Sequence, residues 1–395
     1  MKKFAYIGCL GFIGVITTEF GVIGILPQIA KHYDITIDIA GYLLGAFALI
    51  IALTGPFMTL LMSGYDKRKM MLIAISLFVF TGLVSSFSPP FWLLMLVRIL
   101  PAFLQPVYIA TALSVAVSKA DKKQENELMG IVFSGVAIAM VTTVPLATYL
   151  SSIWSWEVSF MIQTLVSIIA WLGIYVVLPP MPIKEKKTYG SQLQILKKNT
   201  FLVSTAMNFF MITAWFSTYS YFADYLNKAK NMDNTTMSTM LLLFGIVGII
   251  AMRIAGKMLN NSIPKTTAFF LSGTIIIPIL LYIAGTNLWA NIGVIALWGF
   301  LYAPSFLNAS SYMISSASGN LEFANSLATS FGNLGVFLGT TLGGWVIVAH
   351  GVSYTPIISI VFGSLALLMM LLRHFLEKRT TPIHEASGKT KEICC

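Results

Sequence analysis

Charged residues are scarce in this sequence, and their scarcity excludes a water-soluble protein. Of the 395 residues only 10% are Asp, Glu, Lys or Arg, whereas 57% are hydrophobic; an ordinary globular chain carries about 25% charged residues. So little polar surface cannot cover a soluble core of this size. The net charge is +10, but the basic residues are scattered rather than gathered on one face, so we expect no nucleic-acid partner. The composition therefore indicates an integral membrane protein.

Cysteines and catalytic motifs are also scarce. The three cysteines, Cys9, Cys394 and Cys395, are too few and too far apart for a disulfide framework. The sequence has no H-E-x-x-H motif, no Walker loop and no His/Cys cluster with the spacing of metal ligands. We therefore expect no metal and no other cofactor, and an ATP-driven pump within this chain is excluded.

The chain does contain long apolar runs. A helix needs about 20 apolar residues to cross a bilayer, whereas the strands of a membrane barrel are shorter and alternate in polarity. The first run is too long for a signal peptide and contains Glu19, so we expect a retained span. The expected fold class is an all-α membrane protein with twelve transmembrane helices, at residues 4–29, 40–62, 70–88, 92–117, 127–150, 158–179, 200–224, 236–258, 266–285, 288–314, 322–348 and 353–376.

The basic residues lie almost entirely on one side of these spans. With a cytoplasmic N-terminus, 21 of the 25 Lys and Arg residues fall in cytoplasmic segments and 3 in outer loops, and Arg98 lies within a span. Cytoplasmic loops carry the excess of Lys and Arg in membrane proteins. Both termini are therefore expected in the cytoplasm.

One long polar segment, PMPIKEKKTYGSQLQILKKN, follows the sixth span. Some transporters consist of two six-helix halves related by an axis along the membrane normal, with the substrate site between them. The expected organisation is an N-terminal six-helix bundle at 1–179, a basic cytoplasmic linker at 180–199, a C-terminal six-helix bundle at 200–376 and a cytoplasmic tail at 377–395.

Small residues recur in the fifth and eleventh spans. SGVAIAMVTTVPLATYL in span five has a counterpart in GNLGVFLGTTLGGWVIV in span eleven, a weak sign of internal duplication. In the second segment Gly335, Gly339 and Gly343 recur every four residues. Such a stripe lets helices approach closely, so we expect it to serve packing.

Several of these segments together carry a family resemblance. TTEFGVIGILPQIAKHYDIT followed by AGYLLGAFALIIALTGP, TAWFSTYSYFADYL in span seven and FGNLGVFLGTTLGG in span eleven resemble the major facilitator superfamily. Within it they are similar to the proton-coupled efflux branch, which includes bacterial sugar-efflux permeases of the arabinose type and purine- and chloramphenicol-efflux permeases. The resemblance implies the major facilitator fold, a cavity lined by spans one, four, seven and ten, and a monomer. It does not imply which solute is carried.

Two motifs depart from the family pattern. The loop after span two usually reads G-x-x-x-D-R-x-G-R-R; here SGYDKRKMM keeps a basic triplet but lacks the second glycine. The antiporter signature of span five, G-x-x-x-G-P-x-x-G-G, keeps only Gly135 and Pro145 recognisably. The second departure leaves an importer open. We expect a gating role for the loop residues Asp66, Lys67, Arg68 and Lys69.

Two ionisable side chains lie well inside the expected spans, Glu19 and Arg98. A charge facing lipid at a helix centre costs at least about 2.5–3.5 kcal/mol, so such residues are functional candidates. With a rise of about 1.5 Å per residue, Glu19 lies roughly 15 Å and Arg98 roughly 9 Å below the outer surface, near enough to meet or to share a water. We predict that Glu19 carries the proton and Arg98 is its coupling partner. The alternative is a fixed pair that only holds spans one and four together.

Polar and aromatic side chains follow helical stripes on the other cavity spans. Aromatic walls with a few polar anchors suit a neutral or amphiphilic organic solute, although helix packing alone also explains such stripes. The expected substrate-binding residues are Gln105, Tyr108, Asn208, Trp215, Tyr219, Trp298, Tyr302 and Asn308. Asp224 is expected to be a solvated end of span seven, with a gating role as the alternative.

The sequence thus predicts a secondary transporter of the bacterial inner membrane that exports a small drug, sugar or nucleoside-like solute against inward proton flow. The alternative is a symporter or facilitator that imports such a solute. An intramembrane enzyme would need a convergent catalytic set, and only Glu19 and Arg98 are present inside the spans. A sensor would bind its ligand without moving it. The expected partners are the solute, protons and membrane lipid.

Overall fold

The computed structural model describes residues 2–62, 64–118, 125–182, 196–317 and 321–389. These residues contain helices and no strand, and twelve helical segments are long and apolar enough to cross a membrane. The fold class and the number of spans are therefore confirmed. The segments are Lys2–Tyr33, Ile37–Thr59, Lys67–Ser85, Phe91–Val117, Leu128–Ile153, Glu157–Val177, Asn199–Tyr219, Asn234–Asn261, Ile263–Ala284, Leu288–Ile314, Ser326–His350 and Val352–Lys378.

Seven spans are built around one long helix each. The expected boundaries differ from the observed ones by a few residues, most of all at α17, which continues through most of the expected tail. Most of the expected linker, residues 183–195, lies outside the described residues, as do Cys394 and Cys395. The long helices of these seven spans are α3 (Ile37–Leu61), α4 (Lys67–Ser85), α9 (Glu157–Val177), α12 (Asn234–Asn261), α13 (Ile263–Ala284), α16 (Leu321–His350) and α17 (Thr355–Lys389). The turn η5 (Val352–Tyr354) precedes α17.

Four spans are broken into shorter helices beside prolines. The last helix of each has a proline in its first turn or directly before it: Pro27, Pro106, Pro145 or Pro304. Proline lacks the N–H that an interior helical position needs, but the first turn of a helix tolerates it because those N–H groups have no intrahelical acceptor. The pieces are α1 (Lys2–Phe20), η1 (Ile23–Ile25) and α2 (Leu26–Tyr33); α5 (Phe91–Ile99), η2 (Leu100–Phe103) and α6 (Gln105–Val117); α7 (Glu125–Val141) and α8 (Thr143–Ile153); and α14 (Leu288–Tyr302) and α15 (Ser305–Ile314).

The seventh span ends in an irregular segment. Helix α10 (Asn199–Tyr219) is followed by the single turn α11 (Phe222–Asp224) and by η4 (Tyr225–Ala229), a turn of π-helix. Asp224 was expected to be a solvated end, and this expectation is wrong. The carboxylate is only 1% exposed and pairs with Lys228 Nζ at 2.8 Å, because α11 packs against η1 and α2 instead of ending in a solvated loop.

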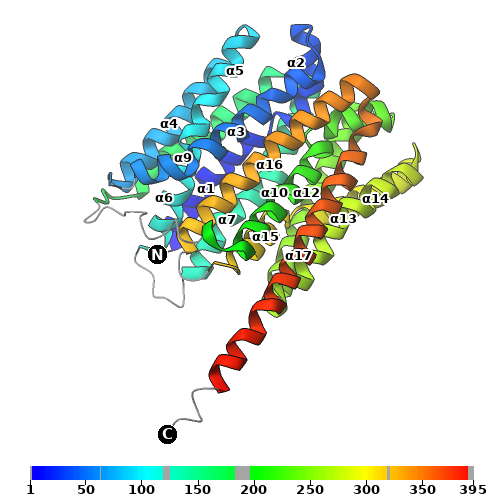
Figure 1. The fold of residues 1–395 in the computed structure, drawn as a ribbon. Coiled ribbons are helices and arrows are strands. Elements are labelled where there is room, and N and C mark those ends of the chain that lie inside the picture. The colour runs from blue at the N-terminus through cyan, green and yellow to red at the C-terminus, as the bar shows by residue number, and fades with distance from the viewer. Residues whose placement is uncertain (1, 63, 119–124, 183–195, 318–320, 390–395) are drawn as a thin grey trace.

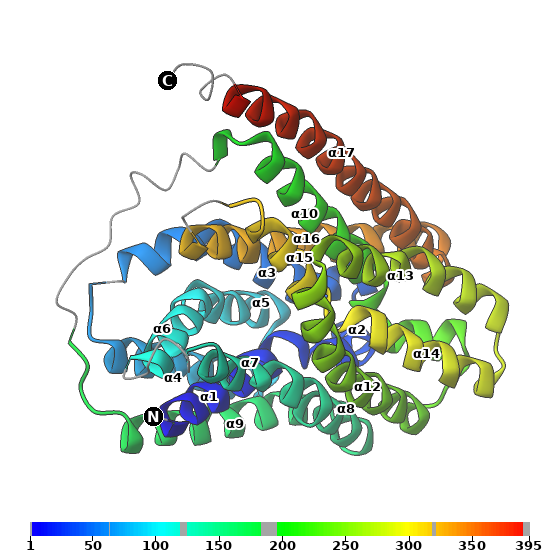
Figure 2. The ribbon, with the colours of Figure 1, turned by 90° about the horizontal axis from the view of Figure 1, so that it is seen from below.

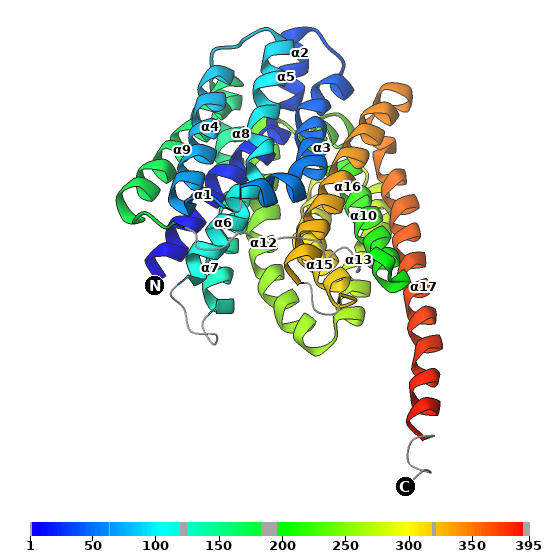
Figure 3. The ribbon, with the colours of Figure 1, turned by 60° about the vertical axis from the view of Figure 1, so that its left-hand side comes forward.

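The helices form two groups side by side. Seen along the bundle, α4 to α9 lie with α1 on one side, and α10 and α12 to α17 lie on the other (Figure 2). We call α1 to α9 the first half and α10 to α17 the second half. Helix α3 runs beside α16 at the boundary (Figures 1 and 2), and the start of α1 and the last turns of α17 lie at the same end of the molecule (Figure 3).

The glycine stripe of α16 packs against α10. A Cβ added at Gly335 would lie 2.8 Å from the carbonyl oxygen of Phe209, and one added at Gly339 would lie 2.6 Å from that of Thr213. The third glycine, Gly343, meets the backbone of α10 one turn further on. The expected packing role of this stripe is confirmed, since any side chain there would push the two helices apart.

Candidate functional site between the two halves

Glu19 lies in the last turn of α1 and is 3% exposed. The helix stops one residue later, and its hydrogen-bonding pattern ends with Gly21 N–H donating to the Thr17 carbonyl at 2.9 Å. Oε2 of Glu19 accepts a hydrogen bond of 2.6 Å from Nε2 of Gln105, the first residue of α6. The acid is thus held by the second segment of the fourth span.

Arg98 lies in the last turn of α5 and is 2% exposed. Its Nη2 donates to the carbonyl of Thr18 at 2.9 Å and its Nε to that of Leu43 at 3.5 Å. The last carbonyls of a helix have no intrahelical donor, so the end of α1 supplies the acceptor that Arg98 uses. A cation is also favoured at this negative end of the helix dipole.

The two charges therefore lie close but bond to different partners. They interact electrostatically, as expected from their depths, while Glu19 takes its hydrogen bond from Gln105 and Arg98 donates to Thr18. The guanidinium also lies over Phe160, 5.6 Å from the ring centre. This geometry leaves both sequence hypotheses open, because Arg98 is an anchor between helices and an electrostatic neighbour of the acid.

The stripe expected on the fourth span does face the first span. Arg98 and Gln105 contact the end of α1, and the Tyr108 hydroxyl donates to the Gly8 carbonyl at 3.2 Å. Tyr108 is fully buried and lies beside Phe12, with 6.4 Å between ring centres. It therefore lies between helices of the first half, further along α1 than Glu19.

An aromatic cluster in the second half is centred on Tyr302. Its ring centre lies 4.4 Å from that of Tyr219 and 5.6 Å from that of Trp215, so the expected faces of spans seven and ten meet. Phe244 of α12 lies 5.3 Å from Tyr302 and 5.9 Å from Trp298. Phe244 was not expected from the sequence, because span eight was not among the cavity spans.

The cluster reaches the acid across the boundary between the halves. Phe20, the residue after Glu19, lies 5.8 Å from Phe216 of α10. Phe216 in turn lies 5.8 Å from both Tyr219 and Tyr302. The end of α1 that carries the buried acid thus contacts the aromatic cluster of the second half.

The two tryptophans also border a small space inside the second half. Trp215 and Trp298 line a cavity of about 10 Å³ together with Thr218 and Ser359, roughly the volume that holds one water. The indole Nε1 atoms of both tryptophans and the Thr218 hydroxyl have no hydrogen-bond partner among the described residues. Both tryptophan side chains thus border this space while their rings also contact the aromatic cluster.

The two predicted asparagines, Asn208 and Asn308, differ in whether their side chains have a polar atom left to bind a solute. Asn208 Nδ2 donates to the Ala328 carbonyl at 2.9 Å, which ties α10 to α16. Asn308 Nδ2 donates to the Pro304 carbonyl at 3.0 Å, and its Oδ1 is buried with no partner among the described residues. Oε1 of Gln105 is likewise buried with no hydrogen-bond partner among the described residues. Since an unpaired buried acceptor costs free energy, Gln105 and Asn308 are the more suitable anchors for a polar solute.

The loop residues after the second span tie helices of the first half together. Asp66 caps α4 by accepting from Lys69 N–H at 2.9 Å, and its other oxygen accepts from Met181 N–H at 2.7 Å. Lys67 Nζ donates to Ser114 of α6 at 2.5 Å. Arg68 Nη2 donates to the carbonyl at the end of α9. Their gating role remains a prediction.

Tyr221, which the sequence does not predict as a site residue, lies between the two halves. Its neighbours there are near the start of α3 and the end of α16. The Tyr221 hydroxyl donates to the Thr340 carbonyl at 2.9 Å. A Cβ at Gly41 of α3 would lie 2.1 Å from this hydroxyl oxygen, and one at Gly344 of α16 2.5 Å. The only sequence signal is that both facing positions are glycines, so that the ring fits between the two helices.

No cluster of three or more His, Cys, Asp or Glu side chains that could hold a metal occurs in the described residues. The polar groups of the site are one carboxylate, one guanidinium, amides and phenols. Such a set can bind an organic solute and hold a proton.

Comparison with known proteins identifies the type of molecule. The family model described as Major Facilitator Superfamily matches residues 8–321. The chain is 27% identical over 368 residues to the "Inner membrane transport protein YdhP" of Escherichia coli (strain K12), with 92% of this chain and 94% of that protein covered. It is 24% identical over 396 residues to a "Probable sugar efflux transporter" of Pasteurella multocida (strain Pm70), with 100% and 98% covered.

A third relative is the "Uncharacterized MFS-type transporter YbcL" of Bacillus subtilis (strain 168). It is 27% identical over 291 residues, with 72% of this chain and 73% of that protein covered. All three are named as transporters, and the similarity to the first two extends over nearly the whole chain.

Proposed function

Because the chain belongs to the Major Facilitator Superfamily and is a transporter rather than an enzyme, we propose that it exports a small organic solute in exchange for protons by alternating access. The observation that carries the proposal is the buried carboxylate of Glu19 at the boundary between the halves. It is bonded to Gln105 of its own half, and the next residue, Phe20, contacts Phe216 of the other half.

This position gives Glu19 surroundings that change during transport. When one half rocks against the other around a central site, the neighbours that Glu19 has across the boundary must change, while its bond to Gln105 lies within the first half. A carboxylate that meets water from one side of the membrane at a time can take up a proton outside and release it inside. Ionisable residues inside membrane proteins commonly serve such proton pathways.

The solute is inferred from the chemistry of the site. The aromatic cluster offers broad apolar surfaces, and Gln105 Oε1 and Asn308 Oδ1 offer two acceptors without partners. Small-molecule sites combine mostly apolar walls with a few polar groups. A neutral solute with hydroxyl or amino donors suits this set, and relatives named as sugar efflux transporters support a sugar among the candidates.

The location and organisation belong to the same proposal. The 21-to-3 distribution of basic residues supports cytoplasmic termini, and a relative named as an inner membrane protein supports the bacterial inner membrane. We propose that the chain works as a monomer, with six-helix bundles at 1–179 and 200–376 joined by the linker 180–199.

Import by proton symport is the second candidate. Apart from Gly135, the glycines of the antiporter signature in span five are not kept, with Thr143 and Ala147 near positions where the family commonly has glycine. The direction of accumulation under an imposed pH gradient separates the two mechanisms.

Uptake into inside-out vesicles tests the proposal. Vesicles energised to an acid interior would be offered a panel of sugars, nucleosides and cationic drugs, with wild type compared with Glu19→Gln. Asp34→Asn is the matched control, because Asp34 is an exposed acid of the same half. We expect a solute that accumulates in the wild type and the control and is lost with Glu19→Gln or a protonophore. Accumulation that persists with Glu19→Gln would contradict the coupling role of Glu19, and accumulation only in right-side-out vesicles under an inward proton gradient would favour import.

A further inference from the structure

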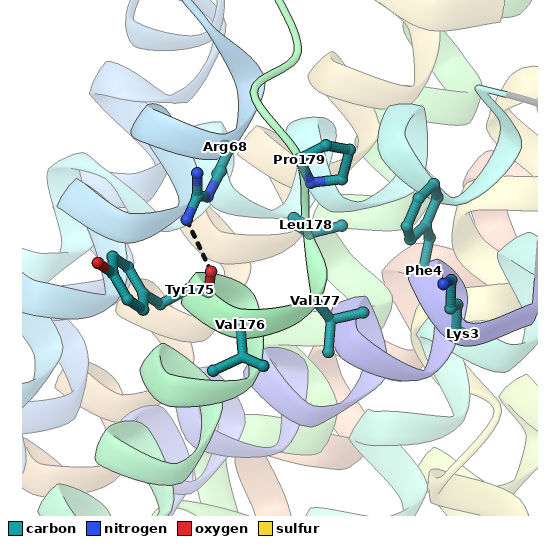
Figure 4. Close-up of a pocket in the computed structure, with 8 residues that line it drawn as sticks. All are labelled: Lys3, Phe4, Arg68, Tyr175, Val176, Val177, Leu178 and Pro179. Carbon is teal, nitrogen blue, oxygen red and sulfur yellow. Dashed lines mark hydrogen bonds between the residues drawn. The ribbon is translucent and has the colours of Figure 1, made fainter.

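A surface pocket of about 540 Å³ lies where α1 and α4 begin and α9 ends. Figure 4 shows Arg68 and Lys3 on opposite sides of this pocket, with Leu178 and Pro179 between them. The pocket is remote from the aromatic cluster, because it is formed only by the ends of first-half helices. The proposed transport mechanism does not use it.

Two cations border the pocket without an acid to neutralise them. In the described part of the chain neither Lys3 nor Arg68 forms an ion pair with a carboxylate. Asp66, two residues before Arg68, already accepts from Lys69 N–H and Met181 N–H. Among the described residues, neither of the two cations of the pocket is therefore paired with a carboxylate.

Arg68 has donors to spare. Its Nη2 donates to the Tyr175 carbonyl at 2.7 Å (Figure 4), and its Nε is buried with no acceptor among the described residues. A guanidinium has five N–H donors in a planar fork that matches the oxygens of a phosphate or carboxylate. The start of α1 adds the positive end of a helix dipole at this pocket.

The outer wall of the pocket is apolar and aromatic. Tyr175 is 54% and Val176 77% exposed, although both belong to a membrane-spanning helix. Trp171, one turn earlier, stacks on Tyr175 with 5.3 Å between ring centres. Tryptophan and tyrosine are enriched where the hydrocarbon meets the headgroups, so this wall indicates that the pocket opens at that boundary.

We propose that this pocket binds the headgroup phosphate of an anionic phospholipid. Arg68 contacts the phosphate oxygens, Lys3 attracts the headgroup from the opposite side of the pocket by its charge, and an acyl chain lies along Tyr175 and Val176. Basic pockets at the ends of membrane helices bind anionic headgroups in this way. A free phosphate would use the cations but not the exposed apolar wall, which is why the lipid is favoured.

Native mass spectrometry of the purified full-length protein tests the proposal. Phosphatidylglycerol and phosphatidylcholine would be titrated against wild type, Lys3→Gln and Lys3→Gln/Arg68→Gln. The control is Arg253→Gln/Lys257→Gln, which removes two exposed cations from α12 in the other half. We expect wild type and control to prefer phosphatidylglycerol, and each pocket cation removed to weaken its binding about fivefold.

Two results would overturn the proposal. One is phosphatidylglycerol binding that does not change in Lys3→Gln, whose exposed side chain can be replaced even if the double variant fails to fold. The other is competition by soluble glycerol phosphate at the same concentrations as the lipid, which would assign the pocket to a free phosphate compound.

Discussion

Gln105 donates a hydrogen bond of 2.6 Å to Glu19 and so joins the broken fourth span to the end of the first helix. The two residues are both buried, and the break at η2 places Gln105 at the very start of α6. The pair ties the acid to its own half, so we expect changes in its surroundings during transport to come from the second half.

Replacing Gln105 by Ala is expected to reduce proton-driven accumulation by roughly tenfold, because a hydrogen bond to a charged group is worth about 1.5–3 kcal/mol. Vesicle uptake measures the effect. Gln163→Ala is the control, since Gln163 is equally buried in the first half but donates to Ser159 instead. Equal losses in both variants would show that Gln105 matters only for packing.

Replacing Arg98 by Gln is expected to lower stability and impair coupling together. The change leaves the Thr18 carbonyl without its donor, at a cost of about 1–3 kcal/mol, and removes the charge near Glu19. Thermal unfolding of the purified protein measures the first effect and vesicle uptake the second. A destabilised variant with intact coupling would support the fixed-pair alternative.

Replacing Tyr302 by Ala is expected to weaken solute binding and to destabilise the protein by about 3–5 kcal/mol, the usual cost of truncating a buried aromatic ring. Tyr302→Phe keeps the ring contacts with Tyr219 and Trp215 and is expected to retain most binding. Tyr282→Ala is the control, because Tyr282 is 89% exposed. Unchanged affinity in a folded Tyr302→Ala variant would remove the cluster from the solute site.

A side chain at Gly339 is expected to disrupt the second half. The added Cβ of Gly339→Ala would lie 2.6 Å from the Thr213 carbonyl oxygen, and such overpacking costs about 1–3 kcal/mol. Gly256→Ala is the matched control, because nothing lies within 4 Å of its added Cβ. Thermal unfolding compares the melting temperatures of the two variants. Equal melting temperatures would show that α10 and α16 do not pack this closely.

The sequence was sufficient for the fold class and for the faces of the helices. Twelve apolar runs and the glycine stripe of α16 follow from composition and periodicity, and Arg98, Gln105 and Tyr108 do share a face. The hydrogen-bond partners of the buried polar side chains could not be predicted from the sequence. Arg98 bonds to the Thr18 carbonyl because α1 ends just beyond it, and a backbone acceptor of this kind leaves no trace in the side-chain pattern.

The ends of the spans were the least predictable part. Asp224 is buried because α11 packs against η1 and α2, whereas an apolar run followed by an acid indicates a solvated end. The contact of Tyr221 between the halves could not be predicted from the sequence for a related reason. Its importance depends on Gly41 and Gly344, which are far apart in the sequence and meet only when the two halves pack together.

Proton release on solute binding tests the central claim most directly. The purified transporter in weakly buffered detergent solution would be mixed with the solute identified in vesicles while a pH indicator is followed. We predict that wild type and Asp34→Asn release protons, and that Glu19→Gln binds the solute without releasing any. Equal proton release from wild type and Glu19→Gln would show that the coupled proton is carried elsewhere.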